Sequence, residues 1–249
     1  MATRDEMARS FGVAASTYES GRPEYPIEAV RWMLDPVVDG ETSIRAVDVG
    51  AGTGKLTRVV EAVGAQTVAV DPDPEMLARL HAELPAIPTF LGTAERMPLP
   101  DASVDAVVLG QAWHWVDVED ASREAGRVLR SGGVLGLIWN VRDDSVDWVS
   151  EMSDIMHGSN AEMMIAEGGP VVGEPFGALE WQSWAWMRSM TRDALFDMAR
   201  SRSYLITAEP DDRARVEREL GVLFDRLGAT EDAAIQLPYV TRAFRTIRP

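Results

Sequence analysis

The 249-residue sequence contains no cysteine, which excludes disulfide bonds, a thiolate metal site and a cysteine nucleophile. It also lacks any apolar run close to the ~20 residues that a membrane-spanning helix needs. Residues 1–6 do not form the apolar core of a signal peptide. From these absences we expect a cytoplasmic protein without metal and without a membrane partner.

Basic residues are scarce beside acidic ones. The chain has 24 Lys and Arg against 40 Asp and Glu, giving a net charge of −16. A surface with this charge repels phosphate backbones, because nucleic-acid affinity depends on basic contacts. We therefore expect no nucleic-acid partner, and a small molecule is favoured as the substrate.

The most informative stretch is AVDVGAGTGKLT at residues 46–57, which predicts a strand, a glycine loop and then a helix. Glycines are needed where backbone turns at positive φ or where a ligand touches the main chain. The helix that follows presents unpaired N–H groups to the loop. A nucleotide-like ligand is expected at this loop.

The glycine spacing separates three classes of nucleotide site. A P-loop needs G-x-x-x-x-G-K-[ST], but Val49 stands five positions before Gly54 and Leu56 replaces the hydroxyl residue. The dinucleotide pattern G-x-G-x-x-G has Lys55 at its last position. The P-loop is excluded, whereas an NAD-type oxidoreductase is disfavoured but stays open.

Two acidic residues flank the predicted ligand loop. Asp48, just before the glycines, disfavours a pyrophosphate through like-charge repulsion and suits a cationic ligand. Asp71 ends the next predicted strand, about 20 residues beyond the loop, where an acidic side chain binds ribose hydroxyls in nucleotide folds. A turn or cap role for Asp71 before Pro72 is the alternative.

Strands and helices alternate in the first half, which predicts a Rossmann-like, doubly wound α/β fold with a seven-stranded, mostly parallel sheet. The predicted strands are Ile44–Val49, Thr67–Asp71, Ile87–Leu91, Val104–Gly110, Val134–Asn140, a tryptophan-rich strand around 181–186, and Ile235–Ile247. The predicted helices are 56–63 ended by Gly64, one from Pro74 capped by Asp73, 118–129 closed by Gly132-Gly133, and one from Pro210 ended by Gly228.

The simplest domain organisation is a single domain over residues 1–249. We expect residues 1–40 to form an N-terminal lid and residues 141–177 to form an insertion over the carboxyl edge of the sheet. A homodimer formed through the insertion is an open alternative to a monomer.

The pattern D-x-G-x-G-x-G at residues 48–54 resembles motif I of the class I S-adenosylmethionine (SAM) methyltransferases. Other stretches resemble a type-11-like branch related to trans-aconitate methyltransferases. They are F-x-x-x-A-x-x-Y-x-x-x-R-P-x-Y-P at 11–26, G-x-A-E-x-M-P-L-P-D-x-S-V-D-A-V at 92–107, QAWHWVD at 111–117, RVLRSGGVLGLIWN at 127–140, and the tail at 201–204 and 237–248.

This resemblance implies SAM as cofactor and S-adenosylhomocysteine as product. The implied cofactor-binding residues are Tyr18, Arg22, Asp48, Gly50, Gly52, Thr53, Gly54, Leu56, Asp71, Pro72, Met76, Thr93, Ala94, Glu95 and Gln111. Thr93 departs from the family pattern, because many relatives carry Asp there. Tyr18 and Arg22 have an alternative role in pinning an N-terminal helix.

The resemblance places the methyl acceptor beside Gln111 and His114, which are the candidate catalytic residues. The expected substrate-pocket residues are Trp113, His114, Trp115, Trp139 and Arg142. A place in the core is the alternative for residues 113–115, because tryptophan is usually well buried. We expect methylation of an oxygen of a small molecule. A carboxylate needs only positioning, whereas a hydroxyl needs a base, for which His114 is the candidate. A non-catalytic SAM-binding sensor or partner protein is the alternative.

Overall fold

The computed structural model describes residues 23–249 except 41, 157–159, 203–204, 206–207 and 231. Tyr18 and Arg22 therefore lie outside the described residues. The chain divides into two compact units. The larger unit comprises Glu24–Trp139, Gly168–Trp184 and Thr241–Pro249, and the described part of the smaller unit comprises Asn140–Glu167 and Ala185–Val240.

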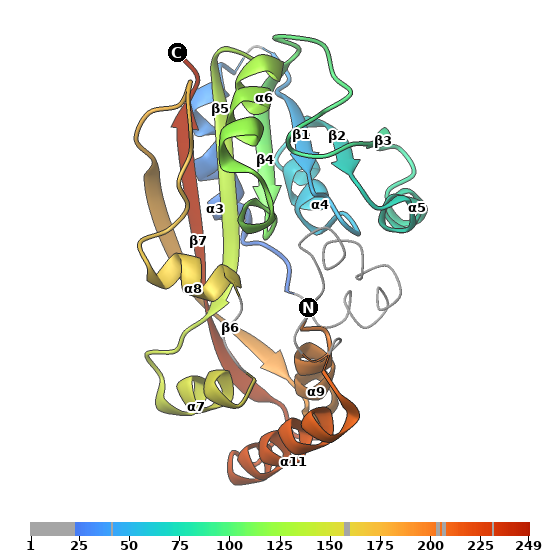
Figure 1. The fold of residues 1–249 in the computed structure, drawn as a ribbon, viewed down its shortest axis with the longest axis vertical. Coiled ribbons are helices and arrows are strands. Elements are labelled where there is room, and N and C mark those ends of the chain that lie inside the picture. Colours follow the sequence, from blue (N-terminus) through green and yellow to red (C-terminus); the bar gives the residue numbers. More distant parts are fainter. Residues whose placement is uncertain (1–22, 41, 157–159, 203–204, 206–207, 231) are drawn as a thin grey trace. The chain divides into compact units, whose positions relative to one another are not determined.

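The strands form a seven-stranded sheet in the order β3-β2-β1-β4-β5-β7-β6 (Figure 1). Their bounds are β1 Arg45–Val49, β2 Gln66–Asp71, β3 Thr89–Leu91, β4 Val104–Gly110, β5 Leu129–Arg142, β6 Glu180–Met190 and β7 Ile235–Ile247. The pairs β1–β2, β1–β4, β2–β3 and β4–β5 are parallel. The predicted Rossmann-like α/β fold is confirmed.

Helices follow most strands. The helices of the larger unit are α3 Ile27–Leu34, η2 Asp35–Val37, α4 Lys55–Ala62, α5 Pro74–Glu83, η3 Trp113–Trp115 and α6 Val118–Val128. Those of the smaller unit are α7 Asp147–Met156, α8 Asn160–Ala166, α9 Arg192–Arg200 and α11 Pro210–Arg226. No helix in the described part of the chain is long and apolar enough to cross a membrane.

Two aspartate caps set where helices of the larger unit begin. Asp73 accepts a hydrogen bond from the N–H of Glu75 at 2.8 Å, and Pro74 occupies the first turn of α5, as predicted. Asp117 caps α6 by accepting from the N–H of Asp120 at 3.0 Å. Helix α5 follows β2, and α6 follows β4 after the short helix η3.

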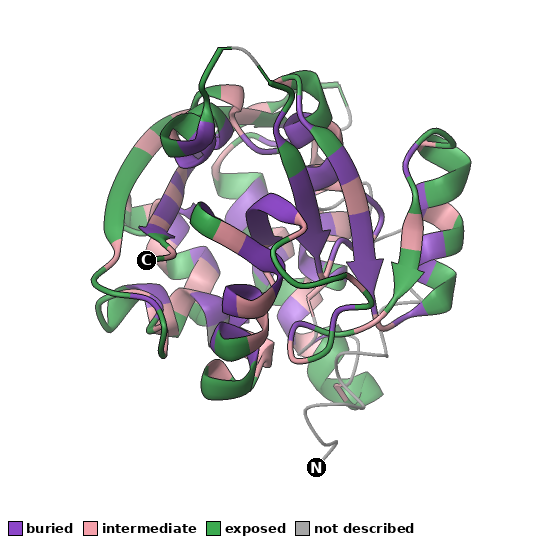
Figure 2. Ribbon diagram, turned by 90° about the horizontal axis from the view of Figure 1, so that it is seen from above, coloured by how far each residue is buried: buried purple, intermediate pink, exposed green. Residues whose placement is uncertain are grey.

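The core of the larger unit is formed by buried residues of α3, α4 and the central strands. Figure 2 shows buried positions in purple along strands of the sheet. Four of the five β1 residues are buried, and six of the seven β4 residues are. Continuous buried strands are typical of a parallel sheet covered on both faces. These strands hold the loops at their carboxyl ends on a rigid support.

The prediction that Gly132-Gly133 closes the helix after residue 118 is wrong. Helix α6 ends at Val128, and both glycines lie inside β5. Leu129 already pairs with Val104, and the register shifts before the next pair. Gly132 has φ +78°, and a Cβ on Gly133 would come within 3.0 Å of backbone oxygens. The glycines therefore serve an irregular strand rather than a helix end.

The smaller unit has its own apolar core, formed mainly by α7, α9 and α11. Trp186 of β6 stacks on Tyr239 of β7 with ring centroids 4.9 Å apart. Of the expected insertion, residues 141–167 fall in the smaller unit and residues 168–177 in the larger one.

Candidate active site

The glycine loop connects β1 to α4 and is tied to the neighbouring strand. Gly50, Gly52 and Gly54 have φ of +67°, +55° and +89°. The N–H of Gly50 donates to the carbonyl oxygen of Val70 at 2.8 Å. A Cβ on Gly50 would lie 2.8 Å from Cβ of Ala112, so this loop closely approaches the segment after β4. Glycine is required at position 50 because its φ is positive and because a side chain would collide with Ala112.

Gly52 faces open space, and Thr53 beside it is buried. A Cβ placed on Gly52 would meet no atom within 4 Å. The Thr53 hydroxyl is buried and has no hydrogen-bond partner within the described part of the chain. Buried polar atoms are normally paired, so this hydroxyl is a candidate ligand contact.

Asp71 joins the loop to the end of β2. One carboxylate oxygen accepts from the N–H of Gly52 at 2.8 Å, and the other accepts from the N–H of Asp73 at 2.8 Å. Burial raises the pKa of Asp71, while these two hydrogen bonds oppose that shift. Asp71 therefore has the turn role before Pro72 that was the alternative to ribose binding. It also contacts the glycine loop, where a ribose would lie.

Asp48 lies fully buried beneath the loop. One carboxylate oxygen accepts from the Thr57 hydroxyl at 2.6 Å, and the other has no partner among the described residues. Burial is the main cause that raises the pKa of Asp48 to about 7, with the negative charge of Asp71 adding to it. Its unpaired oxygen can accept a hydrogen bond from a cationic donor group.

The other predicted cofactor residues with described positions lie in the larger unit. Leu56 is buried in the core of the larger unit, Met76 is buried on α5, and Pro72 is half-buried between β2 and α5. The segment carrying Thr93, Ala94 and Glu95 follows β3. A carboxylate oxygen of Glu95 accepts from the N–H of Asp117 at 2.9 Å, which ties this segment to the start of α6.

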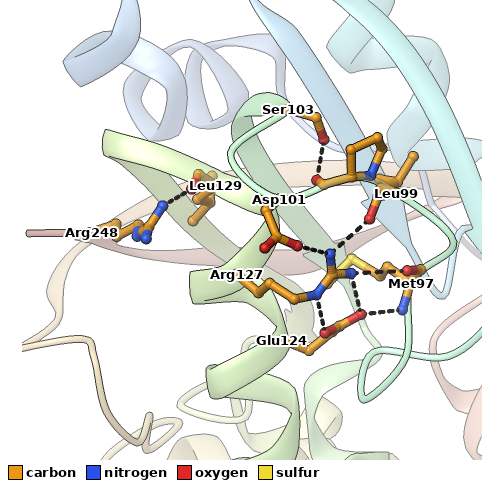
Figure 3. Close-up of polar contacts among 9 residues, drawn as sticks. Met97, Leu99, Asp101, Ser103, Glu124, Arg127, Leu129 and Arg248 are labelled. Atoms are coloured by element: carbon orange, nitrogen blue, oxygen red, sulfur yellow. Dashed lines mark hydrogen bonds and ion pairs between the residues drawn. The ribbon is translucent and has the colours of Figure 1, made fainter.

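Arg127 of α6 anchors the continuation of the same segment (Figure 3). Its guanidinium donates to the carbonyl oxygens of Met97 at 3.1 Å and Leu99 at 2.9 Å, and it bonds the carboxylates of Asp101 and Glu124. The hydrogen bonds to Glu124 and Asp101 raise the pKa of Arg127, so the guanidinium stays charged. One side chain therefore fixes the path of residues 97–101.

The segment after β4 brings Gln111 and His114 to the carboxyl edge. Gln111 has φ +55°, which is strained for a side chain of this kind, and its N–H donates to the carbonyl oxygen of Ile138 at 2.9 Å. In η3, the Trp113 indole N–H donates to the carbonyl oxygen of Val171 at 2.8 Å. The ring of Trp115 lies 4.9 Å from that of His114.

Trp139 of β5 reaches the same segment, because its indole N–H donates to His114 Nδ1 at 3.4 Å. Four of the five expected substrate-pocket residues lie in the larger unit, and two of them, Trp113 and Trp139, are buried. Arg142 is the exception, since it lies in the smaller unit. Its guanidinium is almost fully buried and pairs with Glu162 at 2.9 Å and with the Ser153 hydroxyl.

Tyr25 was missed by the sequence analysis as a site residue. It is buried, and a Cβ on Gly110 would lie 2.6 Å from its hydroxyl oxygen, which places that hydroxyl at the end of β4. The R-P-x-Y-P pattern at residues 22–26 contained the signal. A tyrosine held against a strand end is not distinguishable from a core tyrosine by its spacing.

The donor and acceptor chemistry of this edge fits an adenosyl ligand. Ribose hydroxyls and an ammonium group donate hydrogen bonds, and the edge offers the carboxylates of Asp48 and Asp71 and the hydroxyl of Thr53. The glycine at position 52 leaves space for a ligand on the backbone. Among the described residues, no group of three His, Cys, Asp or Glu side chains could hold a metal ion.

Comparisons with known proteins agree with this chemistry. A family model described as a methyltransferase domain matches residues 47–137. A Mycobacterium tuberculosis protein named as an uncharacterised methyltransferase is 43% identical over 249 residues, covering 98% of this chain and 97% of its own. A methyltransferase-like protein of Schizosaccharomyces pombe is 35% identical over 244 residues, covering 95% and 94%.

The fold also matches solved structures. A protein from Anaeromyxobacter dehalogenans, named provisionally as a type II methyltransferase, superposes with a TM-score of 0.66 at 22% identity, covering 91% of this chain and 97% of that one. These comparisons do not specify the trans-aconitate branch, which stays a prediction. They do show the larger group: the chain belongs to the class I SAM-dependent methyltransferases.

Proposed function

We propose that the chain binds SAM at the glycine loop and transfers its methyl group to an oxygen of a small-molecule acceptor. The observation that carries the donor half is the set of acceptor atoms on Asp48, Thr53 and Asp71 around an open glycine. When bound there, SAM would supply a methyl group held by a positively charged sulfur, ready for transfer to an acceptor aligned opposite the carbon–sulfur bond.

In the proposed reaction, the residues around the glycine loop hold and orient SAM. Asp71, already fixed by two backbone N–H groups, would accept from the ribose hydroxyls. The unpaired oxygen of Asp48 and the hydroxyl of Thr53 would accept from the amino-acid end. The segment of Thr93 to Glu95, anchored on α6, would border the adenine.

The acceptor half rests on Gln111 and His114. Both follow β4, and the close approach of Gly50 to Ala112 puts their segment against the glycine loop. An acceptor oxygen held by these side chains would lie beside the donor, as direct displacement requires. A small, nonphosphate acceptor suits a chain with net charge −16.

The proposal is tested by incubating the protein with tritium-labelled SAM and a metabolite extract. We expect label in a small molecule with the wild-type protein and none with Asp71→Ala. A protein that binds SAM by calorimetry but labels nothing would be a SAM-binding partner or sensor. Binding of NAD in place of SAM would instead favour an oxidoreductase.

A further inference from the structure

Strand β6 stands last in the strand order, so within the described part of the chain no strand pairs with its outer edge (Figure 1). Such an edge presents backbone N–H and C=O groups that can pair with another chain. The opposite edge strand, β3, has only three residues, which limits pairing of this kind. Strand β6 has 11 residues and contains neither proline nor lysine, two residues that normally protect an edge.

The side chains of β6 alternate between two faces. One face packs on the protein, because Trp184 lies edge-on against Trp32 with ring centroids 5.9 Å apart and Met190 is buried. The residues of the other face are exposed and carry no charge: Trp181, Ser183, Ala185, Met187 and Ser189. Trp181 and Met187 are each 62% exposed. Large apolar side chains gathered on an exposed face are typical of an interaction surface.

The sequence of β6 complements itself when two copies run antiparallel about Trp184. Each residue then faces the one at the same distance on the other side of Trp184. In this register Glu180 lies opposite Arg188, and Trp181 lies opposite Met187, at both ends of the paired segment. Moving the centre by one residue in either direction removes both pairs. Opposite charges and large apolar side chains placed across two strands stabilise the pairing, so this register is favoured over its neighbours.

Glu180 is able to take part in such a pair. Its side chain is 69% exposed, and Arg245 of the same chain donates to its Oε2 at 2.9 Å. A carboxylate accepts on both oxygens, so this bond leaves Oε1 able to accept from a second guanidinium. A guanidinium has five N–H donors, and Arg188 of a second copy can therefore bond Glu180 while it keeps contacts within its own chain.

We propose that the protein forms a homodimer in which β6 of one copy pairs antiparallel with β6 of the other about Trp184. The same surface serves both copies, and the sheets of the two chains join edge to edge. Chains of net charge −16 repel each other, and that repulsion is least along an uncharged stripe. This dimer does not use residues 141–177, where the sequence suggested one, and it does not depend on the proposed methyl transfer.

The oligomeric state is measured by sedimentation equilibrium of the full chain. We expect the mass of two chains for the wild type at ~10 µM, and a Kd at least about tenfold weaker in Trp181→Lys and in Met187→Lys. Val222→Lys is the matched control, because Val222 is 69% exposed on α11, and it should dimerise like the wild type. A wild-type monomer at ~100 µM, or a Kd unchanged in Trp181→Lys, would overturn the proposal.

Charge variants test the register. Glu180→Lys and Arg188→Glu each place like charges opposite each other, so each variant alone should dimerise at least about tenfold more weakly. In an equimolar mixture, the introduced lysine meets the introduced glutamate, and the remaining Glu180 meets the remaining Arg188. We expect the mixture to form dimers that are more stable than those of either variant, which also shows that both have folded. A mixture as weak as its components would contradict pairing about Trp184.

Amide hydrogen exchange of the wild-type protein tests the interface without any variant. Backbone amides that pair across the interface exchange more slowly when the protein is concentrated enough to dimerise. We expect added protection in peptides that cover residues 180–190 on going from ~0.1 µM to ~100 µM protein. Protection confined to residues 141–156 would place the dimer contact at the insertion instead and would overturn the proposal, even if the β6 variants did not fold.

Discussion

At the residue scale, Asp48 makes the free energy of unfolding depend on pH in the direction opposite to that of an ion-paired carboxylate. Its pKa is raised to about 7 from 3.8, so between these values the folded protein binds a proton that the unfolded chain releases. The stability that comes from this residue is complete below about pH 4 and is lost as the pH rises through about 7. A ligand ammonium beside Asp48 would offset that loss.

Replacing Asp48 with asparagine should remove this dependence. From pH 4 to 8 the free energy of unfolding of Asp48→Asn should rise relative to the wild type by up to about 4 kcal/mol, measured by urea denaturation at each pH. Asp105→Asn is the control of opposite sign. Hydrogen bonds from Arg45 and Arg130 hold the pKa of Asp105 at about 2, so this variant should lose stability at neutral pH and approach the wild type only in acid. Parallel curves for Asp48→Asn and the wild type would refute the account of Asp48.

Gly52 separates the cost of backbone strain from the loss of a ligand contact. Gly52 and Gly64 both have positive φ, and a Cβ on either meets no atom within 4 Å. Alanine should therefore cost about 1 kcal/mol of stability at both positions. Only Gly52→Ala should weaken the binding of S-adenosylhomocysteine, by at least about tenfold in a calorimetric titration. Similar affinities in the two variants would mean that the open face of Gly52 holds no ligand.

At the element scale, Arg127 connects α6 to the segment after β3. Arg127→Met would leave the carbonyl oxygens of Met97 and Leu99 without their donor and should cost about 1–3 kcal/mol of stability. It should also weaken S-adenosylhomocysteine binding, because residues 93–95 lie on the same segment. Both quantities can be measured by thermal unfolding with and without the ligand.

Arg123 on the same helix provides the matched control. Its exposed side chain pairs only with exposed Asp120 among the described residues, and such surface pairs contribute less than about 1 kcal/mol. Arg123→Met should therefore change neither stability nor affinity by a measurable amount. If it behaved like Arg127→Met, loss of positive charge on α6 rather than loss of the anchor would explain both results.

The accuracy of the sequence predictions differs between kinds of element. Strand β4 and strand β7 were predicted with their observed bounds, because a continuous apolar run and a run between turn residues are local signals. The Gly132-Gly133 pair was misinterpreted because glycine at a helix end and glycine in an irregular strand have the same composition. The pairing of Leu129 with Val104, which decides between them, is not local.

The site residues also divide into those with a local sequence signal and those placed by contacts between distant segments. The glycine loop and Asp71 were predictable because their spacing along one strand–loop–helix unit carries the chemistry. The bond from Trp139 to His114 was not, because it joins β5 to the segment after β4. Arg142 was expected in the substrate pocket, yet its side chain pairs with Glu162 in the smaller unit.

At the scale of the whole molecule, a net charge of −16 should act on ligand binding over a distance. SAM carries a methyl group and a positive charge on sulfur that S-adenosylhomocysteine lacks, and the rest of the two ligands is the same. Raising the ionic strength shortens the screening distance to less than about 10 Å, so SAM affinity should fall more steeply with salt than S-adenosylhomocysteine affinity. Equal salt dependence of the two would show that the protein's net charge does not favour the cationic ligand.

The proposed function requires the edge formed by the glycine loop and Asp71 to bind the adenosyl donor. This requirement can be measured by calorimetric titration of S-adenosylhomocysteine and of NAD into the wild-type protein and Asp71→Asn. We expect one S-adenosylhomocysteine per chain, an affinity at least about tenfold weaker in Asp71→Asn, and no heat with NAD. Unchanged affinity in that variant, or binding of NAD instead, would mean that this edge does not bind the adenosyl donor.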